Sequence, residues 1–311
     1  MTNAGAVPTL ALLSERWPAS RLDRGGSIHW QAGCVFRSFG VHVGVRVNRR
    51  EIIEECQALF PPAWKAIRSP GVDRLYSLVV INRCGQAGEE RLHLLYADGD
   101  LIARAPTLAA VLEVFETDLH QYVAAMSPRL LFVHAGVVGW RGRAIVIPGR
   151  SFTGKTTLVT ELVKAGATYY SDEFAVLDER GHVHAFARPL GIRNAECRRR
   201  RVAVGDLGGR AGRRSLPIGA VVFAPYRAGA AWKAHRLSEG LGVLGLLAET
   251  VAVRRQPQRA LDILRMAVAD VHVFKGVRGE ATAVARTILQ TVAIKRTPLR
   301  IAQLHACQEQ L

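Results

Sequence analysis

The chain has 311 residues, of which 49% are apolar and 22% are charged. This composition is typical of a globular protein with its own core, and the length suits two domains. No apolar run reaches about 18 residues and the start of the chain lacks the basic stretch of a signal peptide, so neither a membrane-spanning helix nor a membrane partner is expected. The net charge of +16 predicts an anionic partner.

Residues 1–125 are expected to form a small α+β domain that serves an accessory or substrate-recognition role. Valines alternate with other residues over 41–47, which predicts a half-buried strand, and apolar residues of 52–59 share one helix face. Strands are expected over 75–82 and 91–96, a hairpin turn at Asp98-Gly99 leading into 101–105, and an amphipathic helix over 107–126. Residues 1–30 are expected to be irregular.

Residues 126–311 are expected to form a second domain, in which strands and helices alternate. Strands are predicted over 130–138, 144–148, 167–171, 174–177, 182–186, 218–223 and 271–275. Helices are predicted over 156–165, 238–253, 257–269, 280–292 and 298–311, and residues 193–215 are interpreted as a basic, glycine-rich loop.

The second domain contains the pattern G-x-x-x-x-G-K-T, placed between a predicted strand and a predicted helix. In that context the glycines let backbone N–H groups point at phosphate oxygens, and the helix N-terminus favours an anion. Lys155 would reach the β- and γ-phosphates of ATP, and the Thr156 hydroxyl would bind Mg²⁺. The expected nucleotide-binding residues are Gly149, Arg150, Ser151, Phe152, Thr153, Gly154, Lys155, Thr156 and Thr157.

Chain geometry places Asp172 beside this loop. The helix after Gly154 runs away from the nucleotide for about eleven residues, roughly 16 Å, and the next strand recovers that distance in five to six residues. Asp172 therefore emerges at the level of the γ-phosphate, and Glu173 follows it directly. A carboxylate there can accept a proton from a hydroxyl nucleophile or bind Mg²⁺, so Thr156, Asp172 and Glu173 are the candidate metal ligands.

The spacing of His134, Gly149, Lys155 and Asp172 resembles the catalytic domain of HPr kinase/phosphorylase. The resemblance covers about residues 120–295, and it implies a P-loop kinase domain with a mixed β-sheet flanked by helices. It also implies that Asp172 is the base that activates an attacking hydroxyl and that His134 lies beside it. The chain is more similar to divergent members of this superfamily, including kinases that act on peptides.

Three further segments bear on this resemblance. Residues 188–192 resemble the family's Arg-Gly-Leu-Gly-Ile signature, but Phe186 stands where the family has an acidic residue, so one Mg²⁺ ligand is either missing or supplied by Glu173. Residues 255–259 resemble its late Pro-Gly-Arg loop, which implies that Arg259, the better match, or Arg255 contacts phosphate. Thr157 replaces a glutamate of the bifunctional members, so the resemblance implies kinase activity and leaves phosphorylase activity open.

The sequence therefore predicts an ATP- and Mg²⁺-dependent kinase that phosphorylates a hydroxyl of a peptide or protein, with serine as the expected acceptor. Two alternatives stay open: a small-molecule hydroxyl kinase of the shikimate-kinase kind, and a nucleotide-binding regulator without transfer activity. The arginine-rich stretch 198–201 lacks aromatic neighbours for stacking, so an acidic acceptor is favoured over nucleic acid. A homo-oligomer is compatible with the sequence.

The cysteines favour a cytoplasmic location. All five are scattered along the chain, and none forms a C-x-x-C pair. That pattern fits reduced thiols better than disulfides or zinc ligands.

Overall fold

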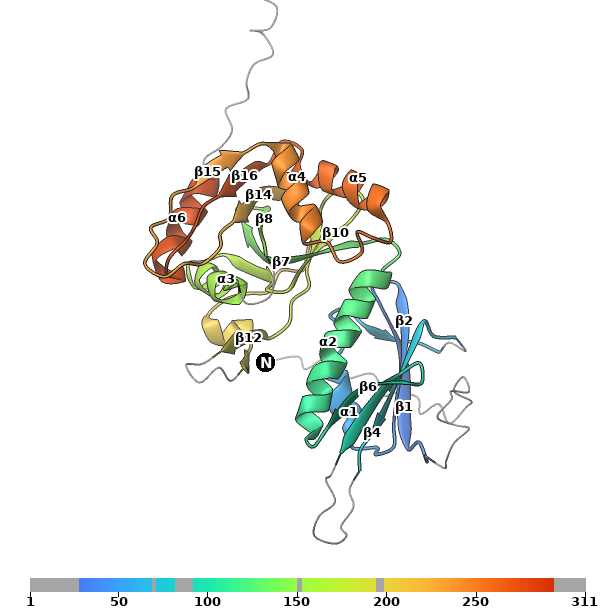
Figure 1. Cartoon of the computed structure of the whole chain (residues 1–311). Helices are drawn as coiled ribbons and strands as arrows, with labels where there is room; N and C mark the ends of the chain where they lie inside the picture. The colour runs from blue at the N-terminus through green and yellow to red at the C-terminus, as the bar shows by residue number, and fades with distance from the viewer. Residues whose placement is uncertain (1–27, 69–70, 82–91, 150–152, 194–198, 294–311) are drawn as a thin grey trace, which may run out of the picture.

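The computed structural model describes residues 28–68, 71–81, 92–149, 153–193 and 199–293. They form two mixed β-sheets, each flanked by its own helices, so the chain is an α/β protein as predicted (Figure 1). The N-terminal sheet carries the strands up to β6, and the C-terminal sheet begins with β7. Among the described helices, none combines the length and apolar character that crossing a membrane requires.

The N-terminal sheet has the strand order β3-β1-β2-β4-β5-β6, in which β2 and β4 are parallel and the other neighbours are antiparallel. Its strands are β1 (Ala32–Ser38), β2 (Val41–Val47), β3 (Lys65–Ala66), β4 (Arg74–Val79), β5 (His93–Ala97) and β6 (Asp100–Ala105). Asp98 and Gly99 both have positive φ in the turn between β5 and β6, which confirms the predicted hairpin.

Two helices cover one face of this sheet, α1 (Ile52–Gln57) and α2 (Leu108–Met126). The side chain of Thr107 caps α2 by accepting a hydrogen bond from the Ala110 amide at 3.3 Å. Val111, Phe115 and Leu119 lie on one side of α2 at intervals of four residues and are buried in the N-terminal core. Both helices were predicted from this apolar spacing.

The C-terminal sheet has the order β11-β10-β7-β8-β14-β16-β15, and β9 also pairs with β7. The parallel neighbours are β8, β14 and β16, so their carboxyl ends meet at one edge of the sheet. The strands are β7 (Leu131–Trp140), β8 (Arg143–Pro148), β9 (Thr168–Ser171), β10 (Phe174–Leu177), β11 (Val183–His184), β14 (Ile218–Phe223), β15 (His235–Leu237) and β16 (His272–Lys275).

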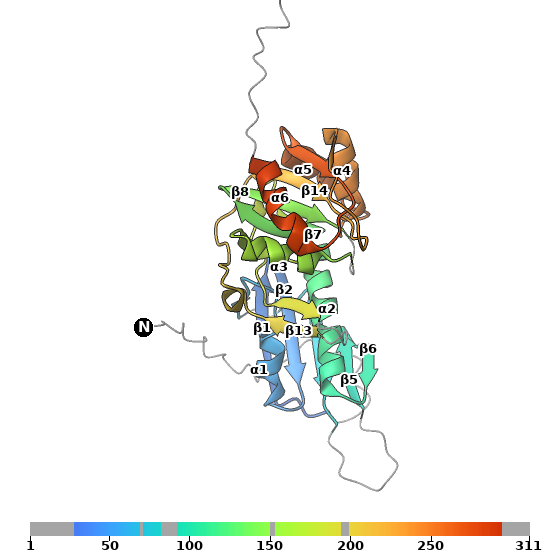
Figure 2. The same cartoon turned by 90° about the vertical axis from the view of Figure 1, so that its left-hand side faces the viewer.

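Helices pack on both faces of the C-terminal sheet (Figures 1 and 2). Two of them, α3 (Lys155–Lys164) and α6 (Ala281–Ala293), share a core with one set of strand side chains. The other two, α4 (Glu239–Ala248) and α5 (Pro257–Val268), cover the opposite face. The sheet is therefore buried on both sides, which explains the nearly continuous apolar runs of its parallel strands.

Two predictions in this domain need correction. Helix α4 ends at Ala248, five residues before the predicted Val253. Residues 249–251 pair along β7 instead: the His134 amide donates to the Glu249 carbonyl, and the Val251 amide donates to the Phe132 carbonyl. The described part of the predicted loop 193–215 contains a hairpin of β12 (Leu190–Arg193) and β13 (Arg199–Val202), followed by the 3₁₀ helix η2 (Val204–Leu207). The predicted tail helix 298–311 lies outside the described residues.

Aromatic rings join the two halves of the molecule. Phe39, in the turn after β1, lies 5.3 Å from the ring of Phe132 in β7 and 5.7 Å from that of Phe186. Phe132 and Phe186 are fully buried. Helix α2 leads directly into β7 (Figure 1), and β7 pairs with β8, the strand that precedes the phosphate loop.

Candidate active site

The glycine-rich loop follows β8 at the carboxyl edge of the parallel strands. The Gly149 amide donates to the His134 carbonyl at 3.1 Å, which ties the start of the loop to β7. Gly154 has φ +79° and directly precedes α3. Residues Arg150, Ser151 and Phe152 lie outside the described residues, whereas Thr153 to Thr156 are half-buried and Thr157 is exposed.

Lys155, the first residue of α3, folds its side chain back over the loop. Its ammonium group donates to the Gly149 carbonyl at 2.5 Å. Burial lowers the pKa of Lys155, and the nearby carboxylates of Glu249, Asp172 and Glu173 oppose that shift in this order. The lysine is therefore a desolvated cation whose charged form an incoming anion would favour.

The Asp172 carboxylate lies beside the loop, at the place that the chain geometry predicted. It accepts hydrogen bonds from the Thr156 hydroxyl at 3.0 Å and from the Tyr169 hydroxyl at 2.9 Å. Asp172 is 9% exposed. Burial, reinforced by the Asp172 charge, raises the pKa of Tyr169, so this phenol remains a neutral donor. The two hydroxyls fix the carboxylate next to the first turn of α3.

Glu173, the next residue, contacts other side chains than Asp172 does. Its carboxylate lies 2.8 Å from the Arg188 guanidinium and 3.9 Å from the His120 ring. The sequence grouped Glu173 with Thr156 as a metal ligand, whereas the structure pairs it with an arginine.

His134 lies in β7 with its ring 4.9 Å from that of Phe174 and its Nε2 3.4 Å from the Gln121 side-chain nitrogen. Burial is the largest influence on this imidazole and lowers its pKa, Glu173 acts in the opposite sense, and Lys155 lowers it further. The resemblance implied that His134 lies beside Asp172. The structure pairs His134 with Phe174, two residues after Asp172, and the His134 carbonyl accepts from the Gly149 amide at the start of the loop.

The structure does not bring Arg259 to the phosphate loop. Its guanidinium donates to Gln256 and lies 3.8 Å from Glu179, in the turn after β10. Asp172 and Glu173 precede β10, and the four residues of that strand separate its two ends by roughly 13 Å.

Arg278 is the arginine that contacts the loop. Its guanidinium donates to the Gly154 carbonyl at 2.8 Å and to the Gly279 carbonyl at 3.0 Å, and it lies 5.3 Å from the Tyr226 ring centre. Arg278 is 2% exposed, and burial lowers its pKa. It follows β16 closely, so it comes from the same edge of the sheet as the loop.

A cleft of about 320 Å³ opens at this edge. Three cationic side chains (Lys155, Lys275 and Arg278) and one carboxylate (Glu249) line it, together with Phe223 and the carboxyl end of β8. The excess of cations fits a phosphorylated ligand. Sequence reasoning missed Lys275, Arg278 and Glu249, although residues after parallel strands are the expected ligand contacts of an open α/β sheet.

The donor set beside the cleft fits Mg²⁺ held together with a nucleotide. Thr156 and Asp172 offer hard oxygen atoms in direct contact with each other. Across the described ranges there is no cluster of three or more His, Cys, Asp or Glu side chains suited to a metal. Mg²⁺ commonly binds one or two protein groups and completes its shell with water and phosphate oxygens, so this small set is sufficient.

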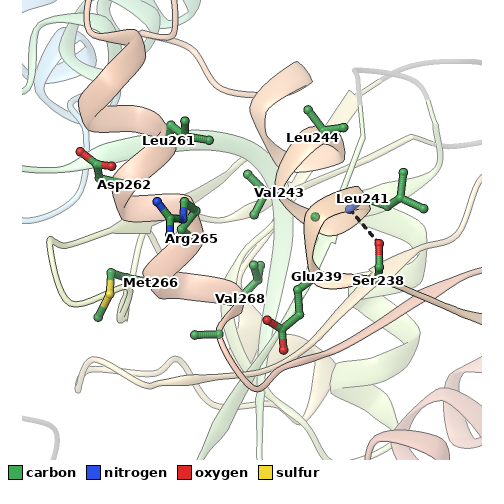
Figure 3. A pocket seen from close by; sticks show the side chains of 12 residues that line it. Ser238, Glu239, Leu241, Val243, Leu244, Leu261, Asp262, Arg265, Met266 and Val268 are labelled. Carbon is green, nitrogen blue, oxygen red and sulfur yellow. Dashed lines mark hydrogen bonds between the residues drawn. The ribbon is translucent and has the colours of Figure 1, made fainter.

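A larger cavity of about 940 Å³ lies between α4 and α5 (Figure 3). Leu241, Val243 and Leu244 of α4 and Leu261 and Met266 of α5 line it, and Val243 and Leu261 lie between the two helices. It contains none of the residues that the sequence singled out for chemistry, so the smaller cleft is the candidate active site.

No protein-family model matches the chain, and a search of curated proteins finds no match either. The functional argument therefore depends on the geometry of the site.

Proposed function

We propose that the protein is a Mg²⁺- and ATP-dependent phosphotransferase of the HPr kinase type, which phosphorylates a hydroxyl, with serine expected, of a peptide or protein. The observation that carries this proposal is the group formed by Lys155, Thr156 and Asp172. A P-loop lysine, the adjacent hydroxyl and a hydrogen-bonded carboxylate lie together at one helix N-terminus. That combination is the one used to hold nucleotide triphosphates.

Each cation of the cleft has a role in this proposal. Lys155 would leave the Gly149 carbonyl and contact the β- and γ-phosphates, while Lys275 offers a further charge from β16. Thr156 and Asp172 would hold Mg²⁺, which when bound neutralises charge on the phosphate oxygens. Arg278 already donates to two carbonyls, so its role is to fix the backbone of the loop at Gly154.

Asp172 would act as the base. The acceptor oxygen attacks the γ-phosphorus, the bond from that phosphorus to the bridging oxygen breaks, and ADP leaves. The hydroxyl proton passes to the Asp172 carboxylate. Each carboxylate oxygen now accepts one hydrogen bond and retains a second lone pair for that proton.

Calorimetric titration with Mg-ATP tests the nucleotide part of the proposal. Lys155→Met should lose detectable binding, because it removes the cation that contacts the phosphates. Lys164→Met is the matched control, since Lys164 is exposed on the same helix and pairs with Glu161. Wild-type protein that binds no ATP in millimolar Mg²⁺ would remove the kinase proposal.

Turnover separates the proposal from the two alternatives. Asp172→Asn should retain ATP affinity within a few-fold and reduce phosphoryl transfer by about 10²–10⁴, as expected for the loss of a general base. Transfer to serine-containing peptides can be followed by mass spectrometry, and transfer to small alcohols would identify a small-molecule kinase instead. Tight ATP binding with neither transfer nor hydrolysis would identify a nucleotide-binding regulator.

A further inference from the structure

A cluster of charged side chains joins the N-terminal domain to the candidate active site. Helix α2 contributes Glu116 and His120, which are 6% and 1% exposed. The C-terminal domain contributes Arg188, Arg201 and the Glu173 carboxylate. The cluster thus contains two arginines and two glutamates; Glu116 and Arg188 are largely buried, Glu173 is half-buried and Arg201 is exposed.

Arg188 is the centre of this cluster. One of its nitrogens, Nη1, lies 3.2 Å from Glu116 Oε1 and contacts His120 Nδ1, and the other, Nη2, lies 2.8 Å from Glu173 Oε2. His120 Nε2 lies 2.9 Å from the Leu59 carbonyl, which can only accept, so Nε2 carries the proton. The Nδ1 lone pair therefore accepts from Arg188. Its contacts with the described N-terminal residues, Glu116 and His120, come from α2.

The cluster reaches the phosphate-binding groups through Glu173. Its backbone carbonyl accepts from the Ala135 amide of β7 at 3.1 Å. The Glu173 charge acts on both Lys155 and His134. A second contact from α2 is independent of Arg188, because Gln121 lies 3.4 Å from the His134 ring nitrogen. Helix α2 is therefore linked to a carboxylate and an imidazole beside the loop.

We propose that the N-terminal domain controls the catalytic competence of the C-terminal domain through Arg188, a positioning residue that holds the Glu173 carboxylate only while Glu116 and His120 hold its guanidinium. This inference rests on the proposed kinase function and adds a regulatory contact to the same site. Ion pairs between buried groups are directional and strong, so removal of the Glu116 charge releases the Arg188 guanidinium from the position in which it meets Glu173. The carboxylate would then leave its present place beside Lys155 and His134.

ATP hydrolysis by Glu116→Gln tests the proposal, with Glu113→Gln as the matched control because Glu113 is exposed on the same helix. We expect kcat to fall about tenfold or more while the KM for ATP stays within about twofold, since the nucleotide contacts are untouched. Arg188→Lys keeps the charge but cannot contact both glutamates, so it should show the same pattern. Combined with Glu116→Gln, it should lower kcat no further than the larger single effect.

Two results would overturn the inference: a Glu116→Gln enzyme with wild-type kcat, or single effects that multiply in the double variant. A wild type that neither binds nor hydrolyses Mg-ATP would instead remove the proposed function. In that case hydrogen exchange decides whether α2 is coupled to the site. Exchange at the Ala135 amide should rise in Glu116→Gln and stay unchanged in Glu113→Gln, and equal exchange in both would refute the coupling.

Discussion

The close approach of Gly154 and Arg278 gives a quantitative test of the loop geometry. Gly154 has φ +79°, and a Cβ added to it would lie 2.5 Å from Arg278 Nη2. That same nitrogen donates to the Gly154 carbonyl at 2.8 Å. Gly154→Ala therefore strains the backbone and pushes a buried guanidinium away from its acceptor.

The two costs can be estimated separately. A left-handed conformation costs an L-residue roughly 1–2 kcal/mol. Losing a hydrogen bond to a charged group costs about 1.5–3 kcal/mol. The expected loss for Gly154→Ala is thus about 3–5 kcal/mol, which in a domain of this size lowers Tm by roughly 6 °C or more. With Arg278 replaced by Ala, the clash is absent and only the backbone cost of roughly 1–2 kcal/mol should remain.

Denaturant unfolding of the four variants in this double-mutant cycle measures both costs. Gly240→Ala is the control, because Gly240 lies in α4 with no atom within 4 Å of an added Cβ. That change should leave stability unaltered or raise it by up to about 1 kcal/mol. If Gly154→Ala costs the same with and without Arg278, the contact between the loop and this arginine is not the source of the strain.

Three further predictions concern electrostatics. Glu173→Gln should lower the pKa of His134 further in an NMR titration, because the Glu173 charge opposes the effect of burial; an unchanged pKa would place the carboxylate elsewhere. Burial raises the pKa of the Cys34 thiol to about 12, so iodoacetamide should modify it only after unfolding, as mass spectrometry can show. Arg200 is exposed on the β12–β13 hairpin, so Arg200→Ser should raise the KM of a glutamate-flanked serine peptide about twofold at low salt and not at high salt.

The fold was predictable wherever one side of an element is apolar and the other is not. Helices α1 and α2 follow that rule. Strand β2 was predicted from its alternating valines, but it is not half-buried as expected, because Gly44 and Arg46 on its other face are buried too. Strand β1 was missed because five successive residues, Ala32 to Phe36, are all buried, which removes the alternation that a half-buried strand shows. The end of α4 was misplaced because apolar residues continue from Val251 to Val253, while pairing along β7 stops the helix at Ala248.

The candidate site divides in the same way between local and distant contacts. Lys155, Thr156 and Asp172 lie within one strand-loop-helix-strand unit, so residue counting placed them together. Arg278 reaches Gly154 across 124 residues, and no spacing rule connects the two. The arginine proposed from the late motif, Arg259, lies at the other end of β10, because α5 places it beside Glu179. The positions of these two arginines therefore follow from the order of strands and helices in the fold and not from spacing in the sequence.

The cations of the cleft lower the stability of the free protein and would favour the binding of an anionic ligand. Burial lowers the pKa of both Lys155 and Arg278, which means that the folded protein disfavours their charged forms. For Lys155 the folded state binds fewer protons than the unfolded chain between its lowered and ordinary pKa, so stability rises with pH in that window. A polyphosphate in the cleft would reverse both shifts by pairing with the charged forms. Burying these cations lowers the stability of the free protein, and pairing with an anion of several charges would offset that cost and so contribute to its affinity. A neutral ligand of the same size would not offset the cost.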